Sequence, residues 1–239
     1  MNVLISMDNG VATLTLNRPE SRNALNLEMC SGLIDACGRA GSDESVKVLF
    51  VRANGPVFCA GADLKERQGM SEAQVRERRM KGFAAYAAIE ALPMPAIAVV
   101  EGPAVGSGCE IAGACDFIVA THEASFRTPE ALRGTVGATQ RLPRILGKRL
   151  AKDMMFTGRT LGAEEARQAG LVARLVSDAD LESTLEEMKK TILNAPQSSL
   201  RLAKRCIDRG VEVDPQGALD AEIAAIDEQL AAGNWMGRQ

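Results

Sequence analysis

The sequence predicts an α/β core followed by a helical tail. Up to about residue 176, short apolar stretches next to turn residues alternate with segments of helical periodicity. One such stretch, AIAVV at 96–100, is apolar throughout, which is typical of a strand buried on both faces. After Arg141 the pattern is mainly helical, and beyond residue 180 it is helical to the end. No linker or low-complexity segment interrupts the 239 residues, so we expect one large domain or a domain with an appendage.

The strands are predicted from alternating or continuous apolar runs bounded by turn residues. Asn9-Gly10 immediately precedes the alternating segment VATLTL, so this strand should be one half of a hairpin. A loop is expected after it, over NRPESRNALN. The expected strands are, in order, 11–16, 46–53, 96–100, 116–121 and 171–176.

The helices are predicted from apolar residues spaced three or four apart and from signals at their ends. Ser71 and Gln74 have the spacing of a capping box, and Gly170 stops a short helix. The expected helices are, in order, 27–40, 71–91, a helix after Gly108, 163–170, 180–194, 197–210 and 216–232.

The composition argues against several classes of function. The net charge is −3 and aromatic residues make up only 3% of the chain, so neither a nucleic acid nor a membrane surface is an expected partner. No apolar run reaches the roughly 18 residues of a membrane span, and the N-terminus lacks the pattern of a signal peptide. Six cysteines without a C-x-x-C pair predict reduced thiols in a cytoplasmic protein.

Two glycine-rich turns are the first candidates for chemistry. CAGADL at 59–64 and VGSGCE at 105–110 each join small residues to the expected start of a helix, where backbone N–H groups are unpaired. Two such turns can direct one N–H each at the same oxygen and form an oxyanion hole. Taken singly, either turn is more typical of an ordinary connection. Ser107 lacks the G-x-S-x-G context of a nucleophile, and the one histidine, His122, has no partner pattern for a triad or a metal.

Two glutamates are the second group of candidates. Glu110 stands among small apolar residues near the start of a helix, where burial penalises its charge. Glu130 follows Pro129, which stiffens the approach to it. Two glutamates beside one pocket can hold opposite protonation states and act as acid and base. The alternatives are a helix-dipole partner for Glu110 and an exposed helix start for Glu130.

Five segments, in order along the chain, resemble the enoyl-CoA hydratase/isomerase (crotonase) superfamily. They are LNRPESRNALN (16–26), FCAGADLKE (58–66), GPAVGSGCEIAGACD (102–116), FRTPEALRGTVGATQRLPRILG (126–147) and TGRTLGAEEARQAGLVARLV (157–176). The resemblance implies a crotonase-like spiral of repeated β-β-α units with a helical C-terminal region. It divides the chain into a core at 1–185 and an oligomerisation region at 186–239, with self-association to a trimer or hexamer.

The resemblance also implies roles for individual residues. Glu110 and Glu130 match the two glutamates of a hydratase, and the backbone N–H groups of Ala62 and Ser107 match its oxyanion hole. The implied substrate is an acyl-CoA thioester, and no metal or separate cofactor is implied. The residues that match the family's contacts with CoA are Arg22, Ala24, Ala60, Asp63, Leu64 and Lys65.

The reaction implied by the resemblance is the reversible addition of water to a 2-enoyl-CoA. The alternatives are an isomerase or an acyl-CoA hydrolase of the same fold, and a catalytically silent CoA-thioester binding protein. Ser107 replaces the middle glycine of the second turn, and the stretch 134–142 is about three residues shorter than the family's G-T-x-P-G-x-G-G-T-Q-R-L. Met80 and Phe83 line either the acyl pocket or the core, and Trp235 is either a subunit contact or an exposed end.

Overall fold

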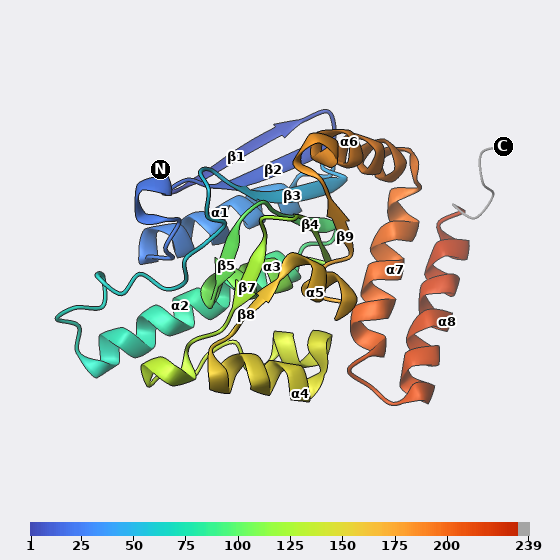
Figure 1. Cartoon of the computed structure of the whole chain (residues 1–239). Coiled ribbons are helices and arrows are strands. Elements are labelled where there is room, and N and C mark those ends of the chain that lie inside the picture. Colours follow the sequence, from blue (N-terminus) through green and yellow to red (C-terminus); the bar gives the residue numbers. More distant parts are fainter. Residues whose placement is uncertain (234–239) are drawn as a thin grey trace.

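A computed structural model gives the fold and describes residues 1–233. The chain forms two sheets with helices packed around them (Figure 1). The six-stranded sheet has the order β1-β2-β3-β4-β6-β9, and the three-stranded sheet has the order β5-β7-β8. The strands are β1 Val3–Asp8, β2 Val11–Leu16, β3 Val48–Ala53, β4 Ala96–Val100, β5 Pro103–Val105, β6 Phe117–Thr121, β7 Ser125–Arg127, β8 Thr160–Gly162 and β9 Arg174–Val176.

The larger sheet matches the sequence-based expectation closely. The hairpin at Asn9-Gly10 is confirmed, because β1 and β2 pair antiparallel with Asp8 opposite Val11. From β2 onward the neighbouring strands pair in parallel, so helices and loops must carry the chain back between them. Strand β4 is buried over its whole length, as its apolar sequence predicts.

Apolar side chains pack on both faces of this sheet. Alternate residues of β4 point to opposite faces: Ala98 belongs to the main core, whereas Ile97 and Val99 join a smaller cluster. The smaller cluster is covered by Leu181 and Leu185 of the C-terminal half of the chain. Burial of β4 on both sides fixes the position of the turn that follows it, and this turn leads to the candidate site.

The helices also lie close to their expected positions. Ser71 and Gln74 form the predicted capping box at the start of α2, with both reciprocal hydrogen bonds present. Two short 3-10 helices, η1 Pro19–Ser21 and η2 Ala131–Arg133, lie in loops. The α-helices are α1 Leu27–Ser42, α2 Glu72–Glu90, α3 Ser107–Gly113, α4 Arg141–Thr157, α5 Ala163–Gln168, α6 Asp178–Asn194, α7 Gln197–Gly210 and α8 Pro215–Ala231.

The C-terminal helices divide into one that belongs to the core and two that stand apart. The expected boundary after residue 185 falls within α6, which packs Leu181, Leu185 and Met188 against the large sheet. Helices α7 and α8 form a hairpin at the edge of the molecule (Figure 1). Trp235 lies outside the described residues. Among the described helices, none is both long enough and apolar enough to cross a membrane.

Candidate active site

The two glycine-rich turns pack directly against each other. The Val105 N–H donates a hydrogen bond of 2.8 Å to the Cys59 carbonyl, and Cys59 and Ala104 form an isolated parallel bridge. Gly108 allows this close approach, since a Cβ there would lie 2.5 Å from the Cys59 carbonyl oxygen. The predicted meeting of the two segments is therefore present in the fold.

The backbone N–H groups of Ala62 and Ser107 are both available as donors. Gly61 and Asp63, on either side of Ala62, are hydrogen-bonded to Leu25, and Ala62 itself donates no hydrogen bond within residues 1–233. Ser107 is the first residue of α3, so its N–H has no acceptor within the helix. The expected helix start at 59–64 is wrong, because α2 begins only at Glu72. The N–H of Ala62 is free for a different reason. Ala62 and Leu25 form an isolated parallel β-bridge, in which the neighbours of Ala62, and not Ala62 itself, make the hydrogen bonds to Leu25.

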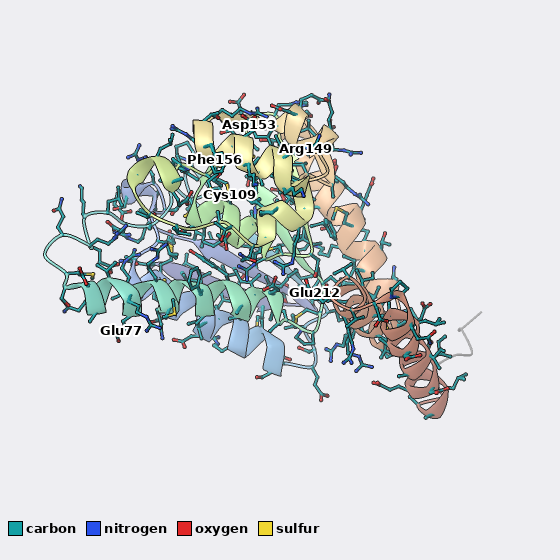
Figure 2. The ribbon with its side chains drawn as sticks, turned by 90° about the horizontal axis from the view of Figure 1, so that it is seen from below. Glu77, Cys109, Arg149, Asp153, Phe156 and Glu212 are labelled. Atoms are coloured by element: carbon teal, nitrogen blue, oxygen red, sulfur yellow. The ribbon has the colours of Figure 1, made fainter. Side chains whose placement is uncertain are left out.

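Helix α3 carries Glu110 into the interior, between α2 and α4. Figure 2 shows Cys109 of α3 between α2, which carries Glu77, and α4, which carries Asp153 and Phe156. The next residue, Glu110, is 6% exposed. A carboxylate in this position needs a strong partner, because an isolated buried charge is very costly.

Arg141, at the start of α4, is the partner of Glu110. Its Nη1 donates to Glu110 Oε2 at 2.8 Å, while Nη2 donates to Glu90 at 2.6 Å. The guanidinium carbon also lies 5.7 Å from the centre of the Tyr86 ring, in a cation–π arrangement. The second oxygen of Glu110, Oε1, is buried and has no partner in the described chain. Glu110 therefore has one oxygen fixed by a cation and one oxygen free to act.

Glu130 reaches the same place from the opposite side. It lies at the start of η2, and its carboxyl group packs against Gly106, the residue before α3. Its Oε2 is buried and, among residues 1–233, has no hydrogen-bond partner. Gly137 of the shortened loop covers the other side of this side chain, since a Cβ on Gly137 would lie 3.1 Å from Glu130 Cγ.

The two carboxyl groups have different electrostatic surroundings. Burial raises the pKa of Glu110, and the charge and hydrogen bond of Arg141 oppose that rise. Burial also raises the pKa of Glu130, and the negative charge of Glu110 raises it further. A backbone hydrogen bond and the charges of Arg133 and Arg79 act in the opposite direction on Glu130. The pKa of each carboxyl group is raised, and of the two only Glu110 has a guanidinium at hydrogen-bond distance opposing the rise.

Gly106 provides a test of this packing. Its φ of 52° and ψ of −106° are unfavourable for alanine, and an added Cβ would overlap Glu130 Oε1. We expect Gly106→Ala to displace the carboxyl group and reduce any activity that needs Glu130 by about 100-fold or more, as measured by steady-state kinetics. Gly170→Ala is the matched control, because Gly170 has a φ of 85° and open space at the Cβ position. Equal losses in the two variants would contradict the proposed contact.

The loop residues predicted to contact CoA form a second part of the site. The Ala60 N–H donates to the Arg22 carbonyl at 3.0 Å, and the Asp63 N–H donates to the Leu25 carbonyl at 2.9 Å. The structure therefore brings the segments 22–25 and 60–63 together. Among the predicted contacts, Arg22, Leu64 and Lys65 are exposed, and Ala24, Ala60 and Asp63 are half-buried.

Asp63 is already engaged within the protein. Partial burial opposes its ionisation, but the hydrogen bond from Arg18 and the N–H groups of Glu66 and Lys65 lower its pKa overall. Arg18 Nη1 also donates to the Ala24 carbonyl at 2.6 Å and so connects the two loops. The Asp63 carboxylate therefore holds the shape of the surface rather than presenting a free charge.

The sequence analysis missed three residues that build the site. Arg141 and Arg18 are recognised only through their partners, which lie 31 and 45 residues away. Asn23 is fully buried, and its side-chain amide donates to the carbonyls of Asn54 and Val57 at 2.9 and 2.8 Å. An asparagine between loop residues gives a weak sequence signal, because its partners come from a distant turn.

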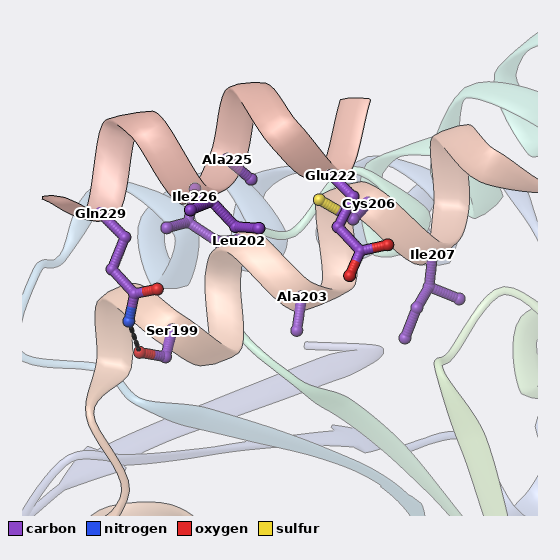
Figure 3. Close-up of a pocket in the computed structure, with 9 residues that line it drawn as sticks. All are labelled: Ser199, Leu202, Ala203, Cys206, Ile207, Glu222, Ala225, Ile226 and Gln229. Atoms are coloured by element: carbon purple, nitrogen blue, oxygen red, sulfur yellow. Dashed lines mark hydrogen bonds between the residues drawn. The ribbon is translucent and has the colours of Figure 1, made fainter. Parts of the chain in front are cut away.

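Two hollows of the described structure are relevant to function. One, of about 510 Å³, lies between α2 and the shortened loop and is lined by Met70, Glu72, Val75, Arg76, Arg79, Met80, Phe83 and Val136. It borders the site, since Gly137 follows Val136 and packs against Glu130. The other, of about 360 Å³, lies between α7 and α8, where Gln229 donates to the Ser199 hydroxyl at 3.0 Å (Figure 3).

Two backbone N–H groups without acceptors in the described chain, the buried Glu110 and the half-buried Glu130 form an arrangement that can perform acid–base chemistry on a carbonyl compound. The family model described as enoyl-CoA hydratase/isomerase matches residues 6–233. The chain belongs to this family and has the crotonase fold.

Individual relatives agree with this assignment. The chain is 38% identical to "Probable enoyl-CoA hydratase 2, mitochondrial" of Arabidopsis thaliana, covering 93% of this chain and 75% of the relative. It is 38% identical to "Enoyl-CoA isomerase/hydratase fer4" of Mycosarcoma maydis, covering 92% and 85%. The crystal structure of enoyl-CoA hydratase from Mycobacterium smegmatis superposes with a TM-score of 0.92 at 34% identity, covering 96% of this chain and 91% of that one.

Proposed function

We propose that this protein catalyses the reversible hydration of a 2-enoyl-CoA thioester. The observation that carries the proposal is the pair Glu110 and Glu130. Glu110 is buried and bonded to Arg141, and Glu130 is half-buried against Gly106 with no partner for its Oε2 in the described chain. A binding protein has no need of two such carboxyl groups, whereas hydration needs a base and an acid. Relatives named as hydratases support the same reaction.

The free N–H groups of Ala62 and Ser107 bind the thioester oxygen in this proposal. As water adds, negative charge moves from the double bond onto this oxygen, and the two donors stabilise the resulting enolate. Removal of one such donor typically costs about 100- to 1000-fold in rate. Since both donors are backbone groups, Ser107 serves as well as the glycine it replaces.

The two glutamates divide the proton transfers. In this proposal Glu110, paired with Arg141, is the base and accepts a proton from water as the water oxygen bonds to the β-carbon. Glu130, whose pKa is raised by burial and by Glu110, is the acid and donates its proton to the α-carbon as the enolate collapses. The product is a 3-hydroxyacyl-CoA, and proton exchange with solvent restores both carboxyl groups. No metal or redox cofactor takes part in these steps.

The loops 22–25 and 60–65 hold the CoA part of the substrate. The Ala60 N–H is bonded to the Arg22 carbonyl, and Ala24 and Ala60 in these two loops form a surface for the adenine and its linker. Exposed Arg22 and Lys65 supply positive charge for phosphates. Leu64 is half exposed and offers apolar contact, while Asp63 holds the loop. Coenzyme A is thus part of the substrate and not a separate cofactor.

Purified protein mixed with crotonyl-CoA tests the reaction, because hydration removes the ultraviolet absorbance of the conjugated enoyl group. A loss of absorbance with formation of 3-hydroxybutyryl-CoA is expected. Shift of the double bond or release of free CoA would instead favour the isomerase or the hydrolase. Binding without any turnover on a panel of enoyl chains would favour the silent binding protein.

Self-association through the C-terminal helices is a second part of the proposal. Helices α7 and α8 bury almost none of their side chains, and six large apolar residues on them are about half or more exposed. They are Ile207, Val211, Leu219, Ile223, Ile226 and Leu230. We expect light scattering after size-exclusion chromatography to give a trimer or hexamer, and Ile207→Asp to shift it towards the monomer. A wild-type monomer at micromolar concentration would contradict this part.

The cytoplasm remains the predicted compartment. All six cysteines are free thiols, and five of them are buried, which suits a reducing environment. The Arabidopsis thaliana relative is named as mitochondrial, so the compartment is tested by localising a tagged copy of the chain in its own cell.

A further inference from the structure

We propose that the acyl group of the substrate ends in a carboxylate and that Arg79 recognises it. This inference rests on the proposed hydration and names the class of enoyl-CoA that the site prefers. It starts from the 510 Å³ pocket lined by Val136, whose neighbour Gly137 packs against Glu130. If Glu130 acts on the substrate as proposed, this pocket lies next to the reacting carbons. Its lining combines apolar side chains with the cations Arg76 and Arg79.

Arg79 lies where the pocket approaches Glu130. A Cβ placed on Gly137 would be 3.9 Å from Arg79 Nη2 and 3.9 Å from Glu130 Cδ. The guanidinium and the proposed acid therefore flank the same point on the shortened loop. We expect Arg79 to reach a terminal carboxylate whose carbon is two or three positions beyond the β-carbon, which corresponds to a five- or six-carbon acyl group.

The charge of Arg79 has no close partner within the protein. The side chain is half-buried, and within residues 1–233 it makes no hydrogen bond or salt bridge. This contrasts with Arg78, the preceding residue, which is paired with Glu66 and the Leu25 carbonyl. Guanidinium groups stay protonated in proteins, so Arg79 presents a permanent cation to the pocket.

The acidic groups near Arg79 do not neutralise it. Glu130 lies beside the same residue, Gly137, but forms no salt bridge with Arg79 in the described chain. Glu72 also lines the pocket but forms no salt bridge in the described chain, and it is outnumbered by Arg76 and Arg79. A substrate carboxylate would supply the missing charge and can accept two parallel hydrogen bonds from a guanidinium.

The rest of the lining favours a short chain with some apolar contact. Met80 and Phe83 are 42% and 44% exposed and face the same pocket. They provide contact for the methylene groups between the double bond and the terminal carboxylate. Of the two alternatives for these residues, the acyl pocket and the core, the inference favours the acyl pocket. An unbranched apolar acyl chain would make this contact but leave Arg79 unpaired.

The test compares glutaconyl-CoA, which ends in a carboxylate, with hex-2-enoyl-CoA, which is similar in size and neutral. For wild-type protein we expect a higher kcat/KM for glutaconyl-CoA. In Arg79→Gln, the ratio of kcat/KM values for the two substrates should fall by about 10- to 100-fold, since a hydrogen bond to a charged group is lost. Arg79→Lys should restore part of the ratio.

Arg167→Gln is the matched control, because Arg167 is an exposed arginine on α5 outside this pocket. It should keep the wild-type ratio. A ratio unchanged in Arg79→Gln, or a wild-type preference for the neutral substrate, would overturn the inference while leaving hydration intact. Absence of hydration for both substrates and for crotonyl-CoA would instead refute the proposed function. The ratio separates recognition from folding defects, because a misfolded variant loses both activities together.

Discussion

The variant Glu130→Gln is expected to lose about 100- to 10,000-fold in kcat/KM for crotonyl-CoA hydration, which is the usual contribution of a positioned acid or base. Glutamine keeps the size of the side chain but cannot donate a carboxylic proton to the α-carbon. Because the buried Oε2 of Glu130 has no hydrogen-bond partner in the described structure, the replacement breaks no hydrogen bond at that atom. The loss should appear in kcat, measured by the enoyl absorbance, with little change in substrate binding.

Glu123→Gln is the control for that experiment. Glu123 is exposed in the turn between β6 and β7. The variant Glu123→Gln should therefore retain wild-type kinetics. If Glu130→Gln kept substantial hydratase activity, the acid role of Glu130 would be wrong. Proton exchange at the α-carbon of the product should be lost along with hydration, since both need the same acid.

The variant Arg141→Met is expected to lower the free energy of unfolding by about 3 kcal/mol at neutral pH. It leaves Glu110 buried at 6% exposure without its ion pair, and it also removes the cation over Tyr86. Urea denaturation followed by circular dichroism measures the change. Arg141→Lys keeps a positive charge and should recover part of the stability, although it cannot contact Glu110 and Glu90 in the same way.

The effect of Arg141→Met should depend on pH in a defined direction. Burial raises the pKa of Glu110 above its usual 4.5, and Arg141 opposes that rise, so removing Arg141 raises the pKa further. A carboxyl group whose pKa is raised by folding destabilises the folded state as pH increases past 4.5 towards the folded pKa. The stability deficit should therefore be larger at pH 8 than at pH 5.

The same change should move the activity profile. If Glu110 must be ionised to accept a proton, a higher pKa shifts the acid limb of the kcat profile to higher pH. In a Glu110→Gln background the buried charge is absent. Adding Arg141→Met to Glu110→Gln should therefore lower the free energy of unfolding by less than about 3 kcal/mol. A pH-independent deficit, unchanged in the double variant, would show that Arg141 acts through packing alone.

Much of the fold follows from local sequence patterns. Asn9-Gly10 defines a hairpin, the capping box of Ser71 and Gln74 starts α2, and the apolar run 96–100 is a strand buried on both faces. The three strands of the smaller sheet were not predicted individually, because each has only three residues. Such strands are too short for a periodic pattern, and they form only because distant segments meet.

The sequence alone determined the family, the candidate glutamates and the two turns that supply backbone donors. Tertiary structure decided what these groups are able to do. Ala62 has a free N–H because Leu25 bonds to its two neighbours, and Glu110 and Glu130 differ because only Glu110 is bonded to Arg141. The physical reason is that protonation and hydrogen bonding depend on distances of a few ångströms between residues far apart in the chain. Local patterns carry little information about those distances.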